Sequence, residues 1–398
     1  MRNLLLFITG WLLLVVPEFL RVYFIMPFPG SQLDETIGLA YFLHRNIFLF
    51  RITGVLLIAY PLYRYIIHGK WGAKIFSMLF AIIAVAVFVM VTRIMQADKM
   101  FLQPEKKIFA GTKENQIGSE RLVIGVSLNG EARCYPIQLI GYHHQVMDTV
   151  GTIPLIVTYC TVCRTGRVYS PYVNGKYEHF RLVGMDQFNA MLEDKTTKSW
   201  WRQENGEAIA GPLKGKFLEE ITSQQTTLQT WLRDHPGSKI MQPDPKFEAE
   251  YASLSGYDNG TIRNELEGTS PHSWDLKSWV VGIQIENSAK AYDWIDLKKK
   301  KVINDTIHNT PVLIFIENDS MTFHAYNRTV NGEALQFIWN DSLQTPADVK
   351  TQSLWNGAGQ CIHGPMTGEH LSPLRSYQEF WHSWKTFHPN STRYTSEQ

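Results

Sequence analysis

Long apolar runs without charges are confined to the first hundred residues of the chain. The clearest extends from Ile75 to Thr92 and is flanked by Lys74 and Arg93, a length that just spans a bilayer core as a helix. Two further apolar stretches contain a few charged residues, which can extend toward the membrane surface or pair inside a helical bundle. We therefore predict a transmembrane anchor over residues 1–96, with about three helices at about 3–26, 47–67 and 75–94.

A cleaved signal peptide is the alternative for the first stretch, because Arg2 precedes a short apolar run. No A-x-A-like cleavage site follows it, and two more apolar stretches do, which favours membrane helices. Glu18 and Arg51 then lie at membrane depth. They could form a buried polar site, but we expect an ion pair that fixes the packing of the helices.

The charges of the loops predict an orientation. The loop between the second and third stretches is basic, with Lys70 and Lys74, whereas the first loop holds Asp34, Glu35 and a single Arg45. Positive loops stay in the cytoplasm. We therefore expect the anchor in the cell (inner) membrane and everything after residue 96 in an extracytoplasmic, periplasm-like compartment.

The rest of the chain has the polar and apolar pattern of short strands. Leu122–Leu128 and Ala132–Leu139 flank an Asn-Gly pair, which is typical of a hairpin. Ile153–Tyr159 is a continuous apolar run and predicts a buried strand. Short helices are expected at Thr227–His235 and Tyr377–His388, each ended by a proline. The predicted fold class is β-rich α+β.

An internal repeat divides this part of the chain. When the sequence is shifted by 157 residues, Ile124–Gly175 aligns with Val281–Gly332 without a gap and with eleven identities in 52 positions. The match resumes near the end of each copy, where Trp231 corresponds to Trp384. We predict two tandem structural repeats, the second of them degenerate: repeat 1 at 104–245, a polar linker at 246–278 and repeat 2 at 279–398.

Composition narrows the function classes. The chain has 398 residues, a formal net charge of +1 and four cysteines, so neither a nucleic-acid partner nor a small disulfide scaffold is expected. It lacks the glycine-rich nucleotide loop, G-x-S-x-G and H-E-x-x-H, which argues against NTPases, α/β-hydrolases and zincins. The lipid bilayer is the one partner that the sequence indicates. A small-molecule or protein partner, and whether the chain is an enzyme, stay open.

Residues that occur in only one repeat are candidates for chemistry. Cys160 and Cys163 form a C-x-x-C directly after the buried strand, and they stand opposite Glu317 and Ser320 in the second repeat. Together with His143 the two thiols could bind a copper or zinc ion. The pair could instead form a redox-active disulfide, with the cysteines as catalytic residues, or an inert disulfide. Either site requires the chain to turn after the strand.

Weaker candidates surround this set. His144 follows His143, Met147 would add a soft sulfur ligand, and Cys361 and His363 occur only in the second repeat. Alternation in an extended segment would place the last two side chains on one face, where they could complete the same pocket or form another.

The residues of the soluble part resemble the DUF3179 family, a domain of unknown function. The resemblance rests on Ala132-Arg133-Cys134-Tyr135-Pro136, on His143 to Gly151, and on Thr158 to Thr165. The family pattern reads H-E-x-x-N-D and T-Y-C-P-x-C, so His143, Asp148, Cys160 and Cys163 match it, whereas His144, Met147 and Thr161 depart from it. The resemblance covers about residues 104–398 and supplies no reaction.

The sequence therefore predicts a membrane-anchored extracytoplasmic protein with a Cys/His metal or redox site in its first repeat. Asp148 and Arg164 are expected to contact the side chains of this site and to orient them. The alternative is a non-catalytic binding or structural module in which the C-x-x-C is a disulfide staple.

Overall fold

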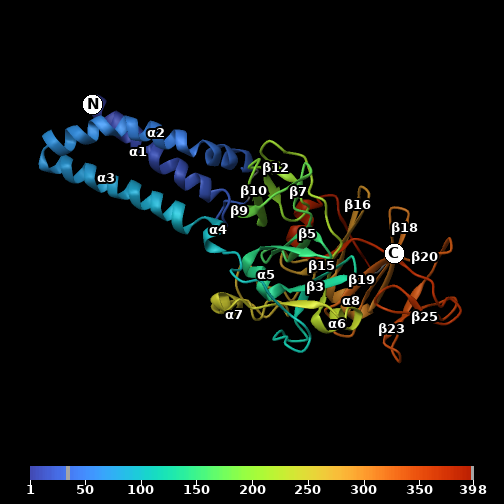
Figure 1. Cartoon of the computed structure of the whole chain (residues 1–398). Coiled ribbons are helices and arrows are strands. Elements are labelled where there is room, and N and C mark those ends of the chain that lie inside the picture. Colours follow the sequence, from blue (N-terminus) through green and yellow to red (C-terminus); the bar gives the residue numbers. More distant parts are fainter. Residues whose placement is uncertain (33–35, 396–398) are drawn as a thin grey trace. The chain divides into compact units, whose positions relative to one another are not determined.

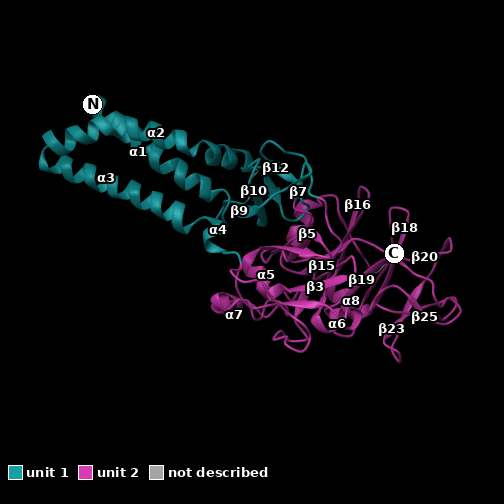
Figure 2. Ribbon diagram, in the orientation of Figure 1, with its two compact units in different colours: residues 1–103, 172–218 teal, residues 104–171, 219–398 magenta. Residues whose placement is uncertain are grey.

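The computed structural model describes residues 1–32 and 36–395, so Asp34 and Glu35 lie outside the described residues. The chain forms two compact units (Figures 1 and 2). Unit 1 comprises residues 1–103 and 172–218, and unit 2 comprises residues 104–171 and 219–398. Each unit is therefore built from two separate stretches of sequence.

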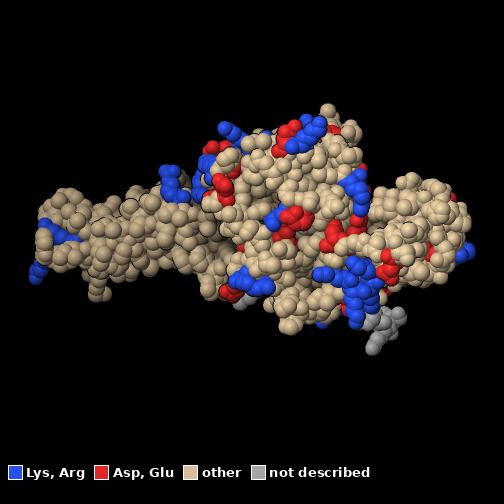
Figure 3. Space-filling view, turned by 90° about the horizontal axis from the view of Figure 1, so that it is seen from below, with Lys and Arg blue, Asp and Glu red and all other residues tan. Residues whose placement is uncertain are grey.

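Three helices of unit 1 are long and apolar enough to cross a membrane, as the sequence predicts. They are α1 (Arg2–Tyr23), α2 (Ile37–His68) and α3 (Trp71–Val89), the last continued by the π-helical turn η1 (Met90–Ile94) and followed by α4 (Ala97–Met100). The shafts of these helices are largely free of charged groups in the space-filling view, and Lys and Arg side chains gather at their free tip (Figure 3).

Helix α2 begins at Ile37, well before the predicted start near residue 47. The extra turns pack on a small sheet of the same unit, where the rings of Tyr41 and His44 lie 5.0 and 5.4 Å from the ring of Trp200. This contact joins segments far apart in the sequence. The hydropathy of α2 alone therefore could not reveal its full length.

Helices α1 and α2 approach closely and share a charged contact. A Cβ on Gly10 would lie 2.8 Å from the backbone oxygen of Gly54, so the contact requires small residues. Farther along, Glu18 is buried and its carboxylate lies 2.5 Å from Arg51 Nε and 2.9 Å from Arg21 Nε. The expected Glu18–Arg51 ion pair is confirmed.

The second stretch of unit 1 forms a four-stranded antiparallel sheet in the order β12-β11-β10-β9, and a separate hairpin of β7 and β8. Its strands are β7 (Tyr172–Val173), β8 (Lys176–Tyr177), β9 (Phe180–Asp186), β10 (Asn189–Asp194), β11 (Trp200–Arg202) and β12 (Ala208–Ala210). Its apolar face shares one core with Ile25 and Ala40 at the adjoining helix ends.

The first half of unit 2 contains a five-stranded sheet, β1-β14-β3-β2-β13, and a three-stranded sheet, β4-β5-β6. Its strands are β1 (Ile108–Ala110), β2 (Leu122–Leu128), β3 (Glu131–Pro136), β4 (Gln145–Val150), β5 (Ile153–Cys160), β6 (Thr165–Tyr169), β13 (Gln224–Thr227) and β14 (Lys239–Gln242). Its helices are α5 (Ile137–His143), α6 (Leu228–Asp234), the 3-10 turn η2 (Pro245–Phe247) and α7 (Glu248–Ser253).

The second half contains sheets in the orders β27-β15-β16-β28, β17-β18-β19-β26 and β22-β23-β24-β25, and the short ladder β20-β21. Its strands are β15 (Trp279–Ile285), β16 (Ser288–Asp293), β17 (Val302–Ile307), β18 (Thr310–Ile316), β19 (Phe323–Asn327), β20 (Thr329–Val330), β21 (Glu333–Ala334), β22 (Phe337–Asn340), β23 (Thr345–Asp348), β24 (Leu354–Trp355), β25 (Cys361–His363), β26 (Ser372–Pro373), β27 (Ser376–Phe380) and β28 (Thr392–Arg393). Its helices are α8 (Trp294–Lys300) and α9 (Trp381–Phe387).

The β-rich α+β class is confirmed, and some local contacts occur in both halves. A Cβ on Gly125 would meet the ring of Trp231 at 2.3 Å, and one on Gly282 would meet the ring of Trp384 at 2.2 Å. In both places glycine allows an indole to lie on a strand. Whether the two halves follow the same backbone path throughout stays a prediction that superposition can test.

Two element boundaries differ from the predicted ones. The strand expected to reach Leu139 ends at Pro136, and α5 begins at Ile137. The helix expected from Tyr377 begins at Trp381, because the preceding residues pair with β15 from Phe380 opposite Trp279 onward. Both differences arise where a helix follows a strand directly, without an intervening turn motif.

Candidate functional site

The Cys-x-x-Cys motif forms a tight turn between two strands of unit 2. Cys160 is the last residue of β5 and pairs with Thr165, the first residue of β6. The chain reverses over residues 161–164, and Arg164 adopts a left-handed conformation with φ of 59°. The turn that the motif requires is therefore confirmed. Both cysteine side chains are fully buried.

Residues of the linker and of the second half of unit 2 form hydrogen bonds with this turn. Lys277 donates from Nζ to the carbonyl oxygen of Val162 at 2.7 Å, and a ring nitrogen of His382 lies 3.0 Å from the same oxygen. The backbone N–H of Phe380 donates to the carbonyl oxygen of Cys163 at 2.9 Å. The motif thus joins the linker and the start of α9 to the first half.

Burial controls the chemistry of the two thiols. It raises the pKa of Cys163 well above the usual value, and a hydrogen bond with Cys160 raises this pKa further. The Ser383 hydroxyl and the Lys277 ammonium act in the opposite direction, with smaller effects. Burial also lowers the pKa of Lys277 itself. At neutral pH Cys163 is therefore protonated, the form that is weakly nucleophilic.

The two expected imidazoles occupy other surroundings. Nε2 of His143 lies 2.6 Å from the hydroxyl of Tyr251, and its ring packs on Phe247. Nδ1 of His144 lies 2.9 Å from the carbonyl oxygen of Tyr159. Among the described residues, no group of three or more His, Cys, Asp and Glu side chains could hold a metal ion. These residues therefore do not form the expected metal site of His143, Cys160 and Cys163. No role for copper or zinc is included in the function proposed below.

The other candidates are also separated. Met147 lies on β4 opposite Ile156, and Asp148 accepts hydrogen bonds from Arg133 and from the Tyr135 hydroxyl. Cys361 is buried in an apolar cluster of the second half. His363, two residues farther along the same strand, is exposed.

Arg164 connects the cysteine turn to a second feature of unit 2. This fully buried guanidinium lies 3.6 Å from the ring centre of Trp279 and donates to the backbone oxygens of Tyr257 and Asp258. Its Nε donates to Oε1 of Gln378 at 2.9 Å. Gln378 in turn lines a cavity of about 300 Å³.

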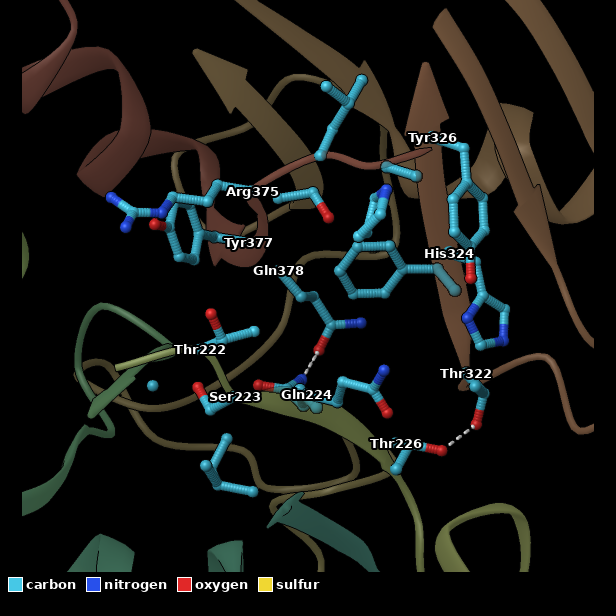
Figure 4. Close-up of a pocket in the computed structure, with 18 of the residues that line it drawn as sticks. Thr222, Ser223, Gln224, Thr226, Thr322, His324, Tyr326, Arg375, Tyr377 and Gln378 are labelled. Carbon is cyan, nitrogen blue, oxygen red and sulfur yellow. Dashed lines mark hydrogen bonds between the residues drawn. The ribbon is translucent and has the colours of Figure 1, made fainter. Parts of the chain in front are cut away.

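The cavity lies where edge strands of three sheets meet, namely β13, β27 and the β19–β26 edge (Figure 4). It therefore lies between the two halves of unit 2. Much of its lining is polar: Glu220, Thr222, Ser223, Gln224, Gln225, Thr226, Thr322, His324, Arg375, Ser376, Tyr377 and Gln378.

Gln378 has one unpaired donor in this lining. Its Oε1 accepts from Arg164 Nε and, at 2.6 Å, from Gln225 Nε2, which identifies this atom as the oxygen. Its Nε2 is buried and has no hydrogen-bond partner among residues 1–32 and 36–395. In Figure 4 this nitrogen points away from the Gln225 bond, toward the side on which His324 lies. A buried amide nitrogen without an acceptor costs about 1–3 kcal/mol, so a bound group that supplies one would be favoured.

His324 faces the same cavity and is oriented by an ion pair. Its Nε2 lies 2.8 Å from Glu317 Oε1, and Arg233 donates to both oxygens of that carboxylate at 2.7 and 3.0 Å. Burial raises the pKa of Glu317, but the hydrogen bonds from His324 and Arg233 outweigh it and lower the pKa to about 2. Because the ionised carboxylate can only accept, Nε2 carries a proton, and Nδ1 is the ring nitrogen left for a further hydrogen bond.

Sequence reasoning missed Gln378, His324 and Gln225, although it singled out Arg164 for a role beside the cysteines. One signal was present: Glu317 stands in the second repeat where Cys160 stands in the first, and this difference suggested a lost site. The structure shows instead a different polar arrangement at that position. Nothing local in the sequence indicates that β13, β19 and β27 meet.

Comparisons with known proteins identify the domain without a reaction. A family model described as "Protein of unknown function (DUF3179)" matches residues 104–391. No curated protein and no solved structure matches the chain.

Proposed function

The chain belongs to the DUF3179 family, whose description assigns no activity, and we propose that it is a membrane-anchored binding protein. Its ligand is a small polar molecule held in the cavity between the halves of unit 2. This proposal follows the predicted alternative of a non-catalytic module rather than a reactive metal site. The buried, unpartnered Nε2 of Gln378 is the observation that carries it.

Two features support binding at this place. The cavity volume of about 300 Å³ lies at the lower end of the range for small-molecule sites. Native proteins leave few buried donors unpaired, and such a donor in a cavity lining indicates an absent ligand or ordered water. The two bonds to Gln378 Oε1 fix the orientation of the amide before any ligand arrives, which lowers the entropic cost of binding.

The anchor supports a location at the cell (inner) membrane with the binding unit outside the cytoplasm. The loop between α2 and α3 contains Lys70, and Arg64 and Lys74 lie nearby on the adjoining helix turns. Such residues favour the cytoplasmic side. The binding unit would then sample molecules of the periplasm or the cell exterior.

Thiol–disulfide chemistry at Cys160 and Cys163 is a second candidate, favoured by the hydrogen bond between the two thiols. In that reaction a small-molecule disulfide would accept two electrons and two protons from the pair. The products would be an intramolecular disulfide and two small-molecule thiols. Burial of both cysteines indicates that such exchange is slow, so the binding role is the one we favour.

Ligand-observed NMR on the full chain in nanodiscs tests the binding proposal, with a mixture of neutral, acidic and basic polar fragments. The informative variant is Gln378→Glu. It keeps an oxygen for Arg164 and Gln225 but replaces the unpaired donor with an acceptor. At least one fragment should bind the wild type, and this variant should bind it about tenfold or more weakly.

Gln229→Glu is the matched control, because Gln229 is exposed and lies outside the cavity lining. It should bind like the wild type. A screen without hits would contradict the proposal, and so would hits that Gln378→Glu leaves unchanged.

A further inference from the structure

We infer that the ligand of this cavity is an uncharged polyhydroxylated molecule of saccharide type. The inference rests on the proposed binding function and specifies its ligand class. It follows from the charges around the cavity, from the hydrogen-bonding groups left open, and from the character of its rim.

The charged groups of the lining already have partners. Glu317 beside the cavity is paired with Arg233 and His324. At the opposite side, the hydroxyl of Tyr377 lies 2.9 Å from both oxygens of Glu220, and Arg375 lies 3.7 Å from the same carboxylate. A charged ligand would therefore lose its hydration without gaining an unpaired counter-charge. This balance favours a neutral molecule.

The open hydrogen-bonding groups are of opposite kinds. Gln378 Nε2 needs an acceptor. His324 Nδ1 makes no hydrogen bond within the described part of the chain, and it donates or accepts according to the tautomer and charge of the ring. A hydroxyl group both donates and accepts. A molecule with several hydroxyls can therefore satisfy Gln378 and His324 together in every form of the ring, whereas a carboxylate can only accept and an ammonium can only donate.

The rim of the cavity also carries uncharged polar side chains. The side chains of Thr222, Ser223 and Gln224 are partly or fully exposed and make no side-chain hydrogen bond within the described structure. Figure 4 shows Thr222 and Ser223 along one side of the cavity and Tyr377 beside them. Hydroxyl and amide groups near an aromatic ring suit the mixed polar and apolar faces of a sugar.

Calorimetric titration of the full chain tests this inference in nanodiscs, because many detergents carry sugar headgroups. The probes are three neutral sugars (glucose, galactose and mannose) and their three uronates, which have the same ring and one negative charge. We expect at least one neutral sugar to bind, its uronate to bind about tenfold or more weakly, and Gln378→Glu to lose the binding while Gln229→Glu retains it.

The outcomes distinguish failure of the saccharide inference from failure of the binding function on which it rests. If a uronate binds as well as its neutral sugar, or if no neutral sugar binds at tens of millimolar, the saccharide class is overturned. The binding function survives that result when charged fragments still bind the wild type and are lost in Gln378→Glu. If neither sugars nor fragments bind, both statements fail.

Discussion

Gln225 donates a 2.6 Å hydrogen bond from its amide nitrogen to the amide oxygen of Gln378. The two residues lie at corresponding places of the two halves, because Gln225 is six positions before Trp231 and Gln378 is six positions before Trp384. The same oxygen accepts from Arg164, the residue after Cys163. The cavity, the cysteine turn and the joint between the halves therefore share one hydrogen-bond network.

This network predicts a ranking of two substitutions. Gln225→Leu should lower the free energy of unfolding by about 1 kcal/mol, because Gln378 keeps its bond to Arg164. Arg164→Leu should cost about 3 kcal/mol or more, because it leaves three buried acceptors without their charged donor. Thermal unfolding of the full chain in nanodiscs measures both. Equal effects of the two changes would contradict the network.

Much of the fold could be predicted because it depends on neighbours in sequence. The Asn129-Gly130 pair joins β2 and β3 in the expected hairpin, and the hydropathy of the first hundred residues identifies the three long helices. The early start of α2 could not be predicted, because it depends on the contact of Tyr41 with Trp200.

The candidate site could be predicted only in part, for the same reason. The turn at Cys160–Cys163 follows from a strand that ends there. His143 lies near the motif in sequence, but it is the last residue of α5 and its ring packs on Phe247 and Tyr251. Helix α5 was not expected, so the direction of His143 could not be derived. The pairing of Gln378 with Arg164 spans 214 residues and has no local signature.

The thiols of Cys160 and Cys163 should resist modification in the folded protein. Burial excludes the reagent and, with the mutual hydrogen bond, raises the pKa of Cys163. At pH 8 an aromatic disulfide reagent should therefore label the pair far more slowly in the native chain than after denaturation. Cys160→Ser and Cys163→Ser identify which thiols react. Labelling of wild-type Cys163 at the rate of an unfolded chain would contradict the burial.

Protonation of the buried His382 ring, which contacts Val162 in the cysteine turn, should destabilise the folded protein. Burial lowers the pKa of His382 to about 4, and the Lys277 charge contributes. A folded-state pKa below the unfolded value of 6.5 gives stability that is present above pH 6.5 and is lost as pH falls toward 4. The loss should reach about 3 kcal/mol. Unfolding measured from pH 7 to 4 should be less steep in His382→Asn, whereas parallel curves would show that another group is responsible.

The charged contact between α1 and α2 should stabilise the helical part only while it is complete. Glu18→Gln leaves the buried Arg21 and the partly exposed Arg51 without their carboxylate, and a cost of about 3 kcal/mol is expected. Adding Arg51→Gln should recover part of that loss, because one uncompensated charge is removed. Thermal unfolding in nanodiscs gives the coupling between the two positions. Additive effects would mean that the pair does not contribute.

We expect the orientation of the chain in the membrane to be set by the end of the helices that carries positive charge. Arg64, Lys70 and Lys74 lie at or near the loop between α2 and α3, and translocation retains such short basic segments in the cytoplasm. If that loop is cytoplasmic, one further crossing by α3 would place the residues after α3 outside the cytoplasm. A reporter that works only outside the cytoplasm should therefore be active when fused after Gln398, and one that works only inside should be silent. Changing the three basic residues to Gln should reduce that difference, because the charge bias sets the orientation. If the cytoplasmic reporter is active instead, unit 2 faces the cytoplasm and its ligand must be sought there.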